Sequence, residues 1–119
     1  MLEEKLIKWI TDISTEGELP QSCCAIYIGL FENETGYMIH FMGSVEFDPD
    51  EDDWACEKDN NYFPRNRYFK TGISTETEWK KFQNEVVAIV RRLKNNKKLI
   101  LSQIEHIAVG FDNGSLEYV

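Results

Sequence analysis

Residues 23–47 have the sequence CCAIYIGLFENETGYMIHFMGSVEF, and this stretch decides the fold. Residues 23–31 are apolar and partly β-branched, which is typical of a buried strand. Polar residues follow and end at Gly36, a residue that adopts a positive φ easily, so a hairpin turn is predicted. Residues 37–47 alternate between an apolar and a more polar set, which indicates a half-buried antiparallel strand. Within that strand, Gly43 is a candidate for a β-bulge.

Two helices are predicted on either side of this hairpin. The first ends before Gly17, and its apolar side chains recur with helical spacing at Leu2, Leu6, Trp9, Ile10 and Ile13. The second is predicted from a cap at Ser74 or Thr75 to about Asn95, because Thr75 and Glu78 have the spacing of a capping box. Its apolar stripe is the most regular in the chain and consists of Trp79, Phe82, Val86, Ile89 and Leu93.

The remaining segments predict strands and turns. A short strand is expected within residues 54–63, and another within residues 104–111. Residues 112–115, Asp-Asn-Gly-Ser, form a strong turn signal, and residues 116–119 are expected to return as a closing strand. Because hairpin turns produce antiparallel pairs, the sequence predicts an α+β fold in one domain, residues 1–119. In this fold an antiparallel sheet carries the two main helices on one face.

Composition narrows the classes of function. The 119 residues carry a net charge of −8 at pH 7, a field that opposes binding to nucleic acid or to an anionic membrane surface. Three cysteines, Cys23, Cys24 and Cys56, do not suggest a disulfide framework, so a reducing compartment is expected. The first residues lack the apolar segment of a secretory signal. We therefore expect a cytoplasmic location.

No motif in the sequence indicates catalysis. His40 and His106 lie on predicted strands without a neighbouring nucleophile signature, and they are expected to be surface or rim residues. Cys23 and Cys24 are adjacent and lack the spacing of a redox or zinc pair, and neighbouring strand positions point to opposite faces. The chain also lacks a glycine-rich phosphate loop. No catalytic residue, cofactor or metal ligand is predicted.

The acidic loop, residues 46–59, is the most unusual feature of the sequence. It holds eight acidic residues and one basic residue, Lys58. Its local charge of −7 accounts for almost all of the net charge of −8. Its acids imitate the start of a calcium loop, but Asp53 stands where glycine is needed and Asp59 where glutamate is usual. A concentrated negative segment steers a basic protein partner, and the predicted partner-binding residues are Asp48, Asp50, Glu51, Asp52, Asp53, Trp54, Glu57 and Asp59.

The neighbouring aromatic residues leave two interpretations of this loop open. Trp54, Tyr62 and Phe63 beside dense charge have the composition of an interaction hot spot. Alternatively, these aromatic residues belong to the core and the acids only keep the loop in solvent.

The last third of the chain resembles a known family. Residues 78–82, Glu-Trp-Lys-Lys-Phe, lie on the predicted second helix, and residues 109–118, Val-Gly-Phe-Asp-Asn-Gly-Ser-Leu-Glu-Tyr, form the terminal hairpin. Together with a short acidic chain they resemble immunity proteins of bacterial polymorphic toxin systems. The resemblance implies a cytoplasmic antidote that occludes a toxin domain, often a nuclease with a basic surface, and that has no catalytic residues.

Two other classes of protein stay open. One is a regulatory interaction domain unrelated to toxins, and the other is a ligand-binding module or enzyme subunit. A pocket with convergent polar groups would favour the ligand-binding class.

Overall fold

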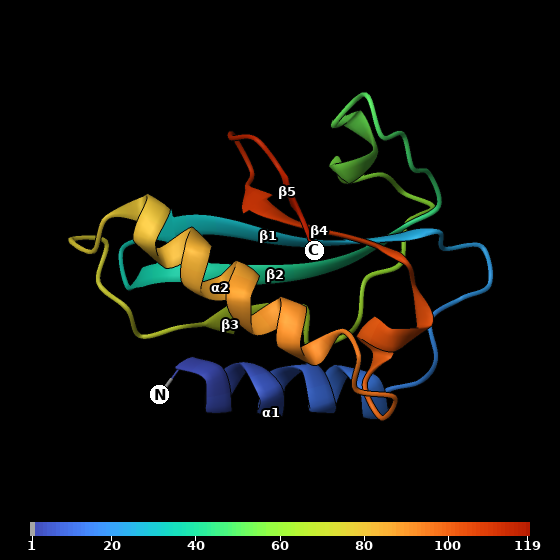
Figure 1. Cartoon of the computed structure of the whole chain (residues 1–119), viewed down its shortest axis with the longest axis horizontal. Coiled ribbons are helices and arrows are strands. Elements are labelled where there is room, and N and C mark those ends of the chain that lie inside the picture. Colours follow the sequence, from blue (N-terminus) through green and yellow to red (C-terminus); the bar gives the residue numbers. More distant parts are fainter. Residues whose placement is uncertain (1) are drawn as a thin grey trace.

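The computed structural model describes residues 2–119 and has two layers, a five-stranded sheet and a pair of helices (Figure 1). Its elements in chain order are α1 (Leu2–Thr15), β1 (Ala25–Asn33), β2 (Gly36–Ser44), η1 (Asp53–Ala55), β3 (Tyr68–Lys70), α2 (Trp79–Leu93), η2 (Ile100–Gln103), β4 (His106–Phe111) and β5 (Glu117–Tyr118). Within residues 2–119, no helix combines the length and the apolar character needed to cross a membrane.

The strand order is β3-β2-β1-β4-β5, so the predicted hairpin 23–47 lies at the centre of the sheet. The turn between β1 and β2 closes at the pair Asn33↔Gly36, and Gly36 has the positive φ that the sequence predicts. The prediction of an entirely antiparallel sheet is wrong, because β1 and β4 pair in parallel. A long connection through α2 returns the chain to the end of the sheet where β1 begins, so β4 runs in the same direction as β1. Turn signals in the sequence do not reveal such a connection.

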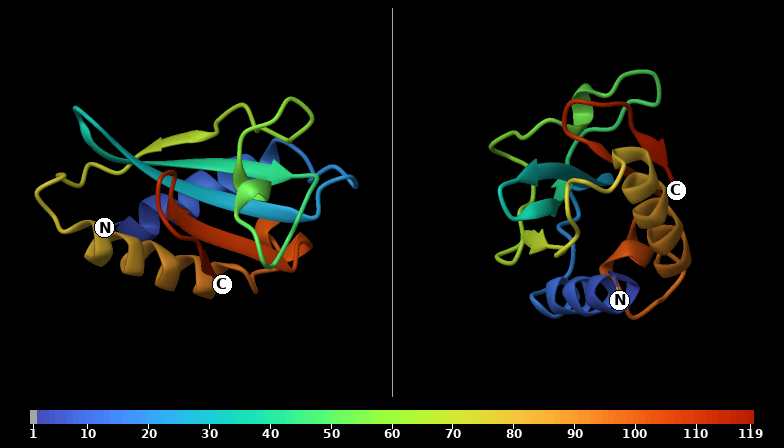
Figure 2. Two further views of the ribbon diagram at one scale, coloured as in Figure 1. Left: turned by 90° about the horizontal axis from the view of Figure 1, so that it is seen from above. Right: turned by 90° about the vertical axis from the view of Figure 1, so that its left-hand side faces the viewer.

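Both helices cover one face of the sheet, which we call the helix face (Figure 2). The period-two pattern of β1 turns Ile26, Ile28 and Leu30 toward them, and these residues are fully buried. Helix α1 contributes the predicted apolar set to this core, and α2 contributes Phe82, Val86, Ile89 and Leu93 as well as Val87 and Val90.

The start of α2 differs from the prediction. The helix begins at Trp79 with Glu78 as its N-cap, and no side chain caps it. The Ser74 hydroxyl accepts a bond from the Glu76 amide (3.1 Å) in a separate turn, so the residues of the apparent capping box precede the helix. As the first helical residue, Trp79 lies beyond the edge of the core and is 52% exposed, unlike the rest of its predicted stripe. The helix ends at Leu93, slightly before the predicted Asn95.

Two further local predictions are wrong. Residues 54–63 contain only the end of η1 and a single bridge between Tyr62 and Gly43, while the short third strand falls later, at β3. Gly43 forms no bulge, since the β1–β2 register runs through it without interruption. A Cβ at this position would lie 3.1 Å from Cys23 Sγ and 3.2 Å from Tyr62 Cβ. The absence of a side chain therefore lets Cys23 and Tyr62 pack closely against β2.

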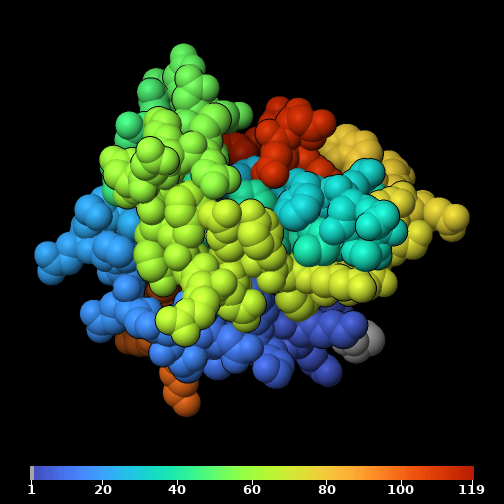
Figure 3. Space-filling view, turned by 180° about the vertical axis from the view of Figure 1, so that it is seen from behind, coloured from blue at the N-terminus to red at the C-terminus, as the bar shows by residue number. Residues whose placement is uncertain are grey.

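The opposite face of the sheet carries a smaller apolar cluster. It contains Ala25, Tyr27, Met42, Trp54 and Ala108, and residues of the acidic loop cover part of it. We call this side the pocket face, because the loop and the turn between β4 and β5 stand on either side of a hollow (Figure 3). The helices leave this face free, so solvent reaches the part of it that the acidic loop does not cover.

Candidate functional site

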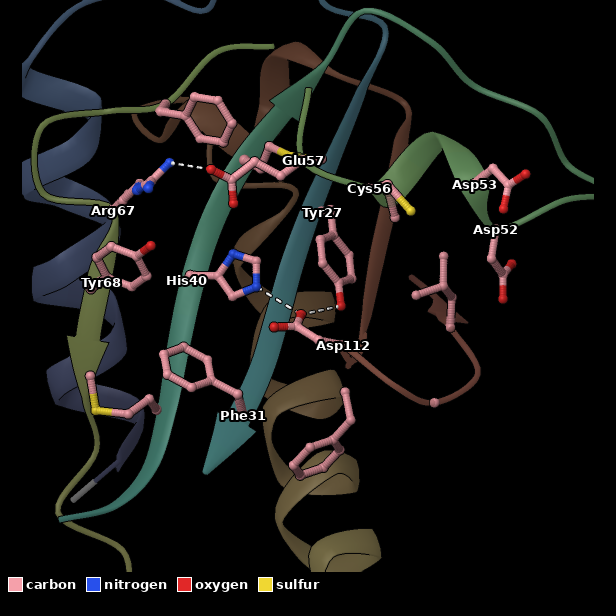
Figure 4. A pocket seen from close by; sticks show the side chains of 17 residues that line it. Tyr27, Phe31, His40, Asp52, Asp53, Cys56, Glu57, Arg67, Tyr68 and Asp112 are labelled. Carbon is pink, nitrogen blue, oxygen red and sulfur yellow. Dashed lines mark hydrogen bonds and ion pairs between the residues drawn. The ribbon is translucent and has the colours of Figure 1, made fainter. Parts of the chain in front are cut away.

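A pocket of about 800 Å³ lies on the pocket face. Its floor comes from β1 and β2, and its walls come from β3 with the segment before it, from the acidic loop and from the β4–β5 turn (Figure 4). Segments more than 80 residues apart in the chain therefore meet here: Tyr27 on β1 contacts Asp112 in the β4–β5 turn, with a sequence separation of 85.

His40 occupies the floor of the pocket because of the residue opposite it. It pairs with Gly29 on β1, where a Cβ would lie only 1.9 Å from His40 Nε2. Without that Cβ, the imidazole lies across β1 and reaches Asp112, with 2.8 Å between Nε2 and Oδ1. Only 18% of the His40 side chain is exposed. The sequence predicted a surface or rim position for His40, whereas the side chain lies largely buried on the pocket floor. No motif indicated its partner, Asp112.

Asp112 is held from two sides. The Tyr27 hydroxyl lies 2.8 Å from Asp112 Oδ1 and 3.0 Å from the Gly110 carbonyl oxygen. Burial raises the pKa of Asp112, but the hydrogen bond and charge of His40 and the bond from Tyr27 outweigh burial, so the net pKa is lowered. Burial, and then the charge and hydrogen bond of Asp112, raise the pKa of Tyr27 far above its ordinary value. Asp112 is thus a carboxylate and Tyr27 a neutral donor.

Aromatic rings surround this pair. The ring centroids of Tyr27, Phe31 and Tyr68 lie 5.4, 5.8 and 6.3 Å from that of His40. At the far end, the Arg67 guanidinium lies 4.5 Å from the ring centroid of Phe63 and 4.8 Å from that of Tyr68. Its Nη1 is 3.6 Å from Glu57 Oε1. This wall therefore already accommodates one guanidinium group by cation–π contact.

The acids of the acidic loop are all exposed, as predicted. Asp52, Asp53 and Glu57 also line the pocket, whereas the other predicted acids, Asp48, Asp50, Glu51 and Asp59, lie outside its lining. The loop thus has two parts, one facing the pocket and one facing solvent.

Trp54 differs from the rest of the predicted partner-binding set. It is 2% exposed, its Nε1 donates to the Tyr118 hydroxyl (3.2 Å), and its ring packs beside Phe47. Its side chain fixes the loop to the sheet and is not accessible to a partner in this structure. For Trp54, the interpretation as a core residue is the one that the structure supports.

The other candidate residues do not form a second site. His106 stacks on Phe47 with 3.8 Å between ring centroids. Cys23 is buried and Cys24 is exposed, as predicted, but both precede β1, so the predicted strand starts two residues too early. Among residues 2–119, no group of three or more His, Cys, Asp or Glu side chains could hold a metal ion.

Comparison of the chain with protein-family models, with curated proteins and with solved structures finds no match. The resemblance to immunity proteins therefore stays a prediction. The pocket and the acidic loop beside it are the features from which a function can be inferred.

Proposed function

We propose that this protein binds a basic protein partner on its pocket face and inhibits that partner by covering it. One observation carries the proposal: the exposed acidic loop forms a wall of the pocket, so the main concentration of charge and the concave surface lie on the same side of the molecule. Charge of one sign beside a cleft attracts the partner over long range, and the cleft supplies close contact.

The shape of the molecule supports occlusion. Both helices pack on the helix face, and the pocket face keeps large side chains such as Tyr68, 50% exposed, at the surface. An inhibitor of this kind needs complementarity and slow dissociation and no reactive group.

The partner proposed is a bacterial toxin domain with a basic surface, which makes the protein an immunity protein. The support is the resemblance of residues 78–82 and 109–118 to such proteins. In the structure, the second of these segments supplies Asp112 and much of the turn beside the pocket.

The candidate toxin is the product of the gene adjacent to the one that encodes this protein. Co-expression of the two proteins tests this proposal. We expect rescue from that product's toxicity in proportion to the amount of complex recovered, with equimolar protein needed for full protection. Rescue by a trace of this protein without a detectable complex would contradict occlusion and would indicate an enzyme that modifies the toxin.

The pocket also supports a second candidate function, a small-molecule binding module. Its volume of about 800 Å³ falls in the range of ligand sites, and polar groups of Tyr27, His40 and Asp112 converge in it. A metabolite that raises the unfolding temperature of the isolated protein, and loses this effect in the variant Phe31→Ala, would favour this candidate over the first.

A further inference from the structure

The charges around the pocket are unequal. Four carboxylates line it, Asp52, Asp53, Glu57 and Asp112, against the single guanidinium of Arg67. Arg67 is offset by Glu57, and Asp112 faces His40. Asp52 and Asp53 form no ion pair within residues 2–119. The pocket therefore favours a positively charged group and disfavours an anion.

Asp112 offers a fixed acceptor. The contacts from His40 and Tyr27 both reach Oδ1, and no hydrogen bond within the described chain reaches Oδ2 (Figure 4). The side chain is half exposed and lines the pocket, so the carboxylate can meet a group bound there. A carboxylate that is already oriented loses little freedom when it binds a donor, and charge-assisted bonds of this kind are stronger than neutral ones.

The aromatic wall distinguishes among cations. Phe31 and Tyr68 meet edge to face at 6.2 Å, and the guanidinium of Arg67 already lies over Tyr68 and Phe63. A guanidinium is planar and weakly hydrated, so it stacks on rings and enters a pocket lined by aromatic side chains at a lower cost than an ammonium group.

We propose that the pocket receives an arginine side chain of the protein partner, whose guanidinium binds Asp112 and packs against Phe31 and Tyr68. This inference rests on the proposed function, because it takes the basic partner to be a protein. The acidic loop attracts that partner, and the pocket holds one of its arginines.

The probe for this site is N-acetyl-arginine methylamide, titrated into isotope-labelled full-length protein and followed by backbone amide NMR. We expect saturable shifts at Gly29, His40 and Asp112. The neutral isostere, N-acetyl-citrulline methylamide, should bind about tenfold more weakly, because it keeps the shape and loses the charge. The lysine derivative should bind more weakly than the arginine derivative.

Two variants locate the bound group, and one is a control. Asp112→Asn should weaken the arginine probe about tenfold. Asp52→Asn should weaken it less and does not endanger the fold, since Asp52 makes no side-chain cap bond to η1. Asp59→Asn removes the same charge outside the pocket and should leave probe binding unchanged.

Equal binding of the arginine and citrulline derivatives, preference for N-acetyl-glutamate methylamide, shifts confined to residues outside the pocket, or no binding of any probe would each overturn the inference. These results leave the proposed function intact if the protein still forms an inhibitory complex with the adjacent gene's product. Conversely, probe binding without such a complex would support the arginine site and contradict the proposed function.

Discussion

His40 Nε2 lies 2.8 Å from Asp112 Oδ1, and this contact joins β2 to the turn after β4 across the whole width of β1. The two residues are 72 positions apart. The contact exists because β4 runs parallel beside β1 and because Gly29, between them, has no side chain. It sets the floor of the pocket and the position of the β4–β5 turn at the same time.

The first prediction concerns acid stability. Because His40 and Tyr27 lower the pKa of Asp112, its carboxylate stabilises the fold above the ordinary value of 3.8, and this contribution is lost as the pH falls through the lower folded-state pKa. Asp112→Asn should therefore unfold at lower urea concentration than the wild type near neutral pH, and the difference should shrink below pH 3.8. Urea unfolding at a series of pH values measures this.

Asp59→Asn is the control for the loss of one charge, since Asp59 is exposed and outside the pocket. A difference between wild type and Asp112→Asn that stays constant from neutral to acidic pH would contradict the first prediction.

The second prediction concerns Gly29. In Gly29→Ala the new Cβ would lie 1.9 Å from His40 Nε2, so the imidazole must turn away and lose Asp112. We expect a loss of about 1–3 kcal/mol in the free energy of unfolding, as for overpacking elsewhere. Gly114→Ala is the matched control, because its Cβ would come no closer than 3.6 Å to another heavy atom. In a His40→Ala background, Gly29→Ala should cost less; an undiminished cost would place the clash elsewhere.

The sequence predicted those parts of the fold that depend on local pattern. The spacing of apolar residues placed α1 and the buried side of α2, and Gly36 marked the central turn. It did not predict the parallel pair of β1 and β4, because two strands joined by a distant crossover carry no shared local signal. The third strand has only three residues, too few for alternation to show.

The third prediction tests the core against the surface of α2. Phe82 is 1% exposed and stacks on Tyr37 with 4.3 Å between ring centroids. Phe82→Ala should lower the free energy of unfolding by about 3–5 kcal/mol. Trp79→Ala removes a larger side chain from a position that is 52% exposed and should cost clearly less. Equal losses in urea unfolding would mean that Trp79 belongs to the core after all.

The candidate site was predictable only in part. The acidic loop, with its local net charge of −7, can be recognised from the sequence alone, and its exposure to solvent follows from that charge. The pocket beside it was not predicted, because His40 on its floor and Asp112 in its wall meet only after the sheet has formed, across Gly29. The alternation that put His40 on the less buried side of β2 was the one available signal.

The last prediction concerns association with the partner. Asp50, Asp52 and Asp53 are exposed and none of them forms an ion pair within residues 2–119, so their replacement by lysine should leave the unfolding midpoint nearly unchanged. Because steering acts on the encounter, the triple variant should associate at least about tenfold more slowly at low salt, and its rate should depend less on salt. Stopped-flow association with the adjacent gene's product measures this.

The matched control replaces Glu18, Glu34 and Glu76, also exposed, by lysine and changes the net charge equally. If overall charge alone governed the encounter, both variants would slow to the same extent. If the acidic loop steers the partner onto the pocket face, the loop variant should slow more than the control. The difference should be clearest near physiological salt, where exposed charges more than about 8–10 Å from the approach path are screened. An unchanged rate in the loop variant at low salt would remove the loop from the binding mechanism.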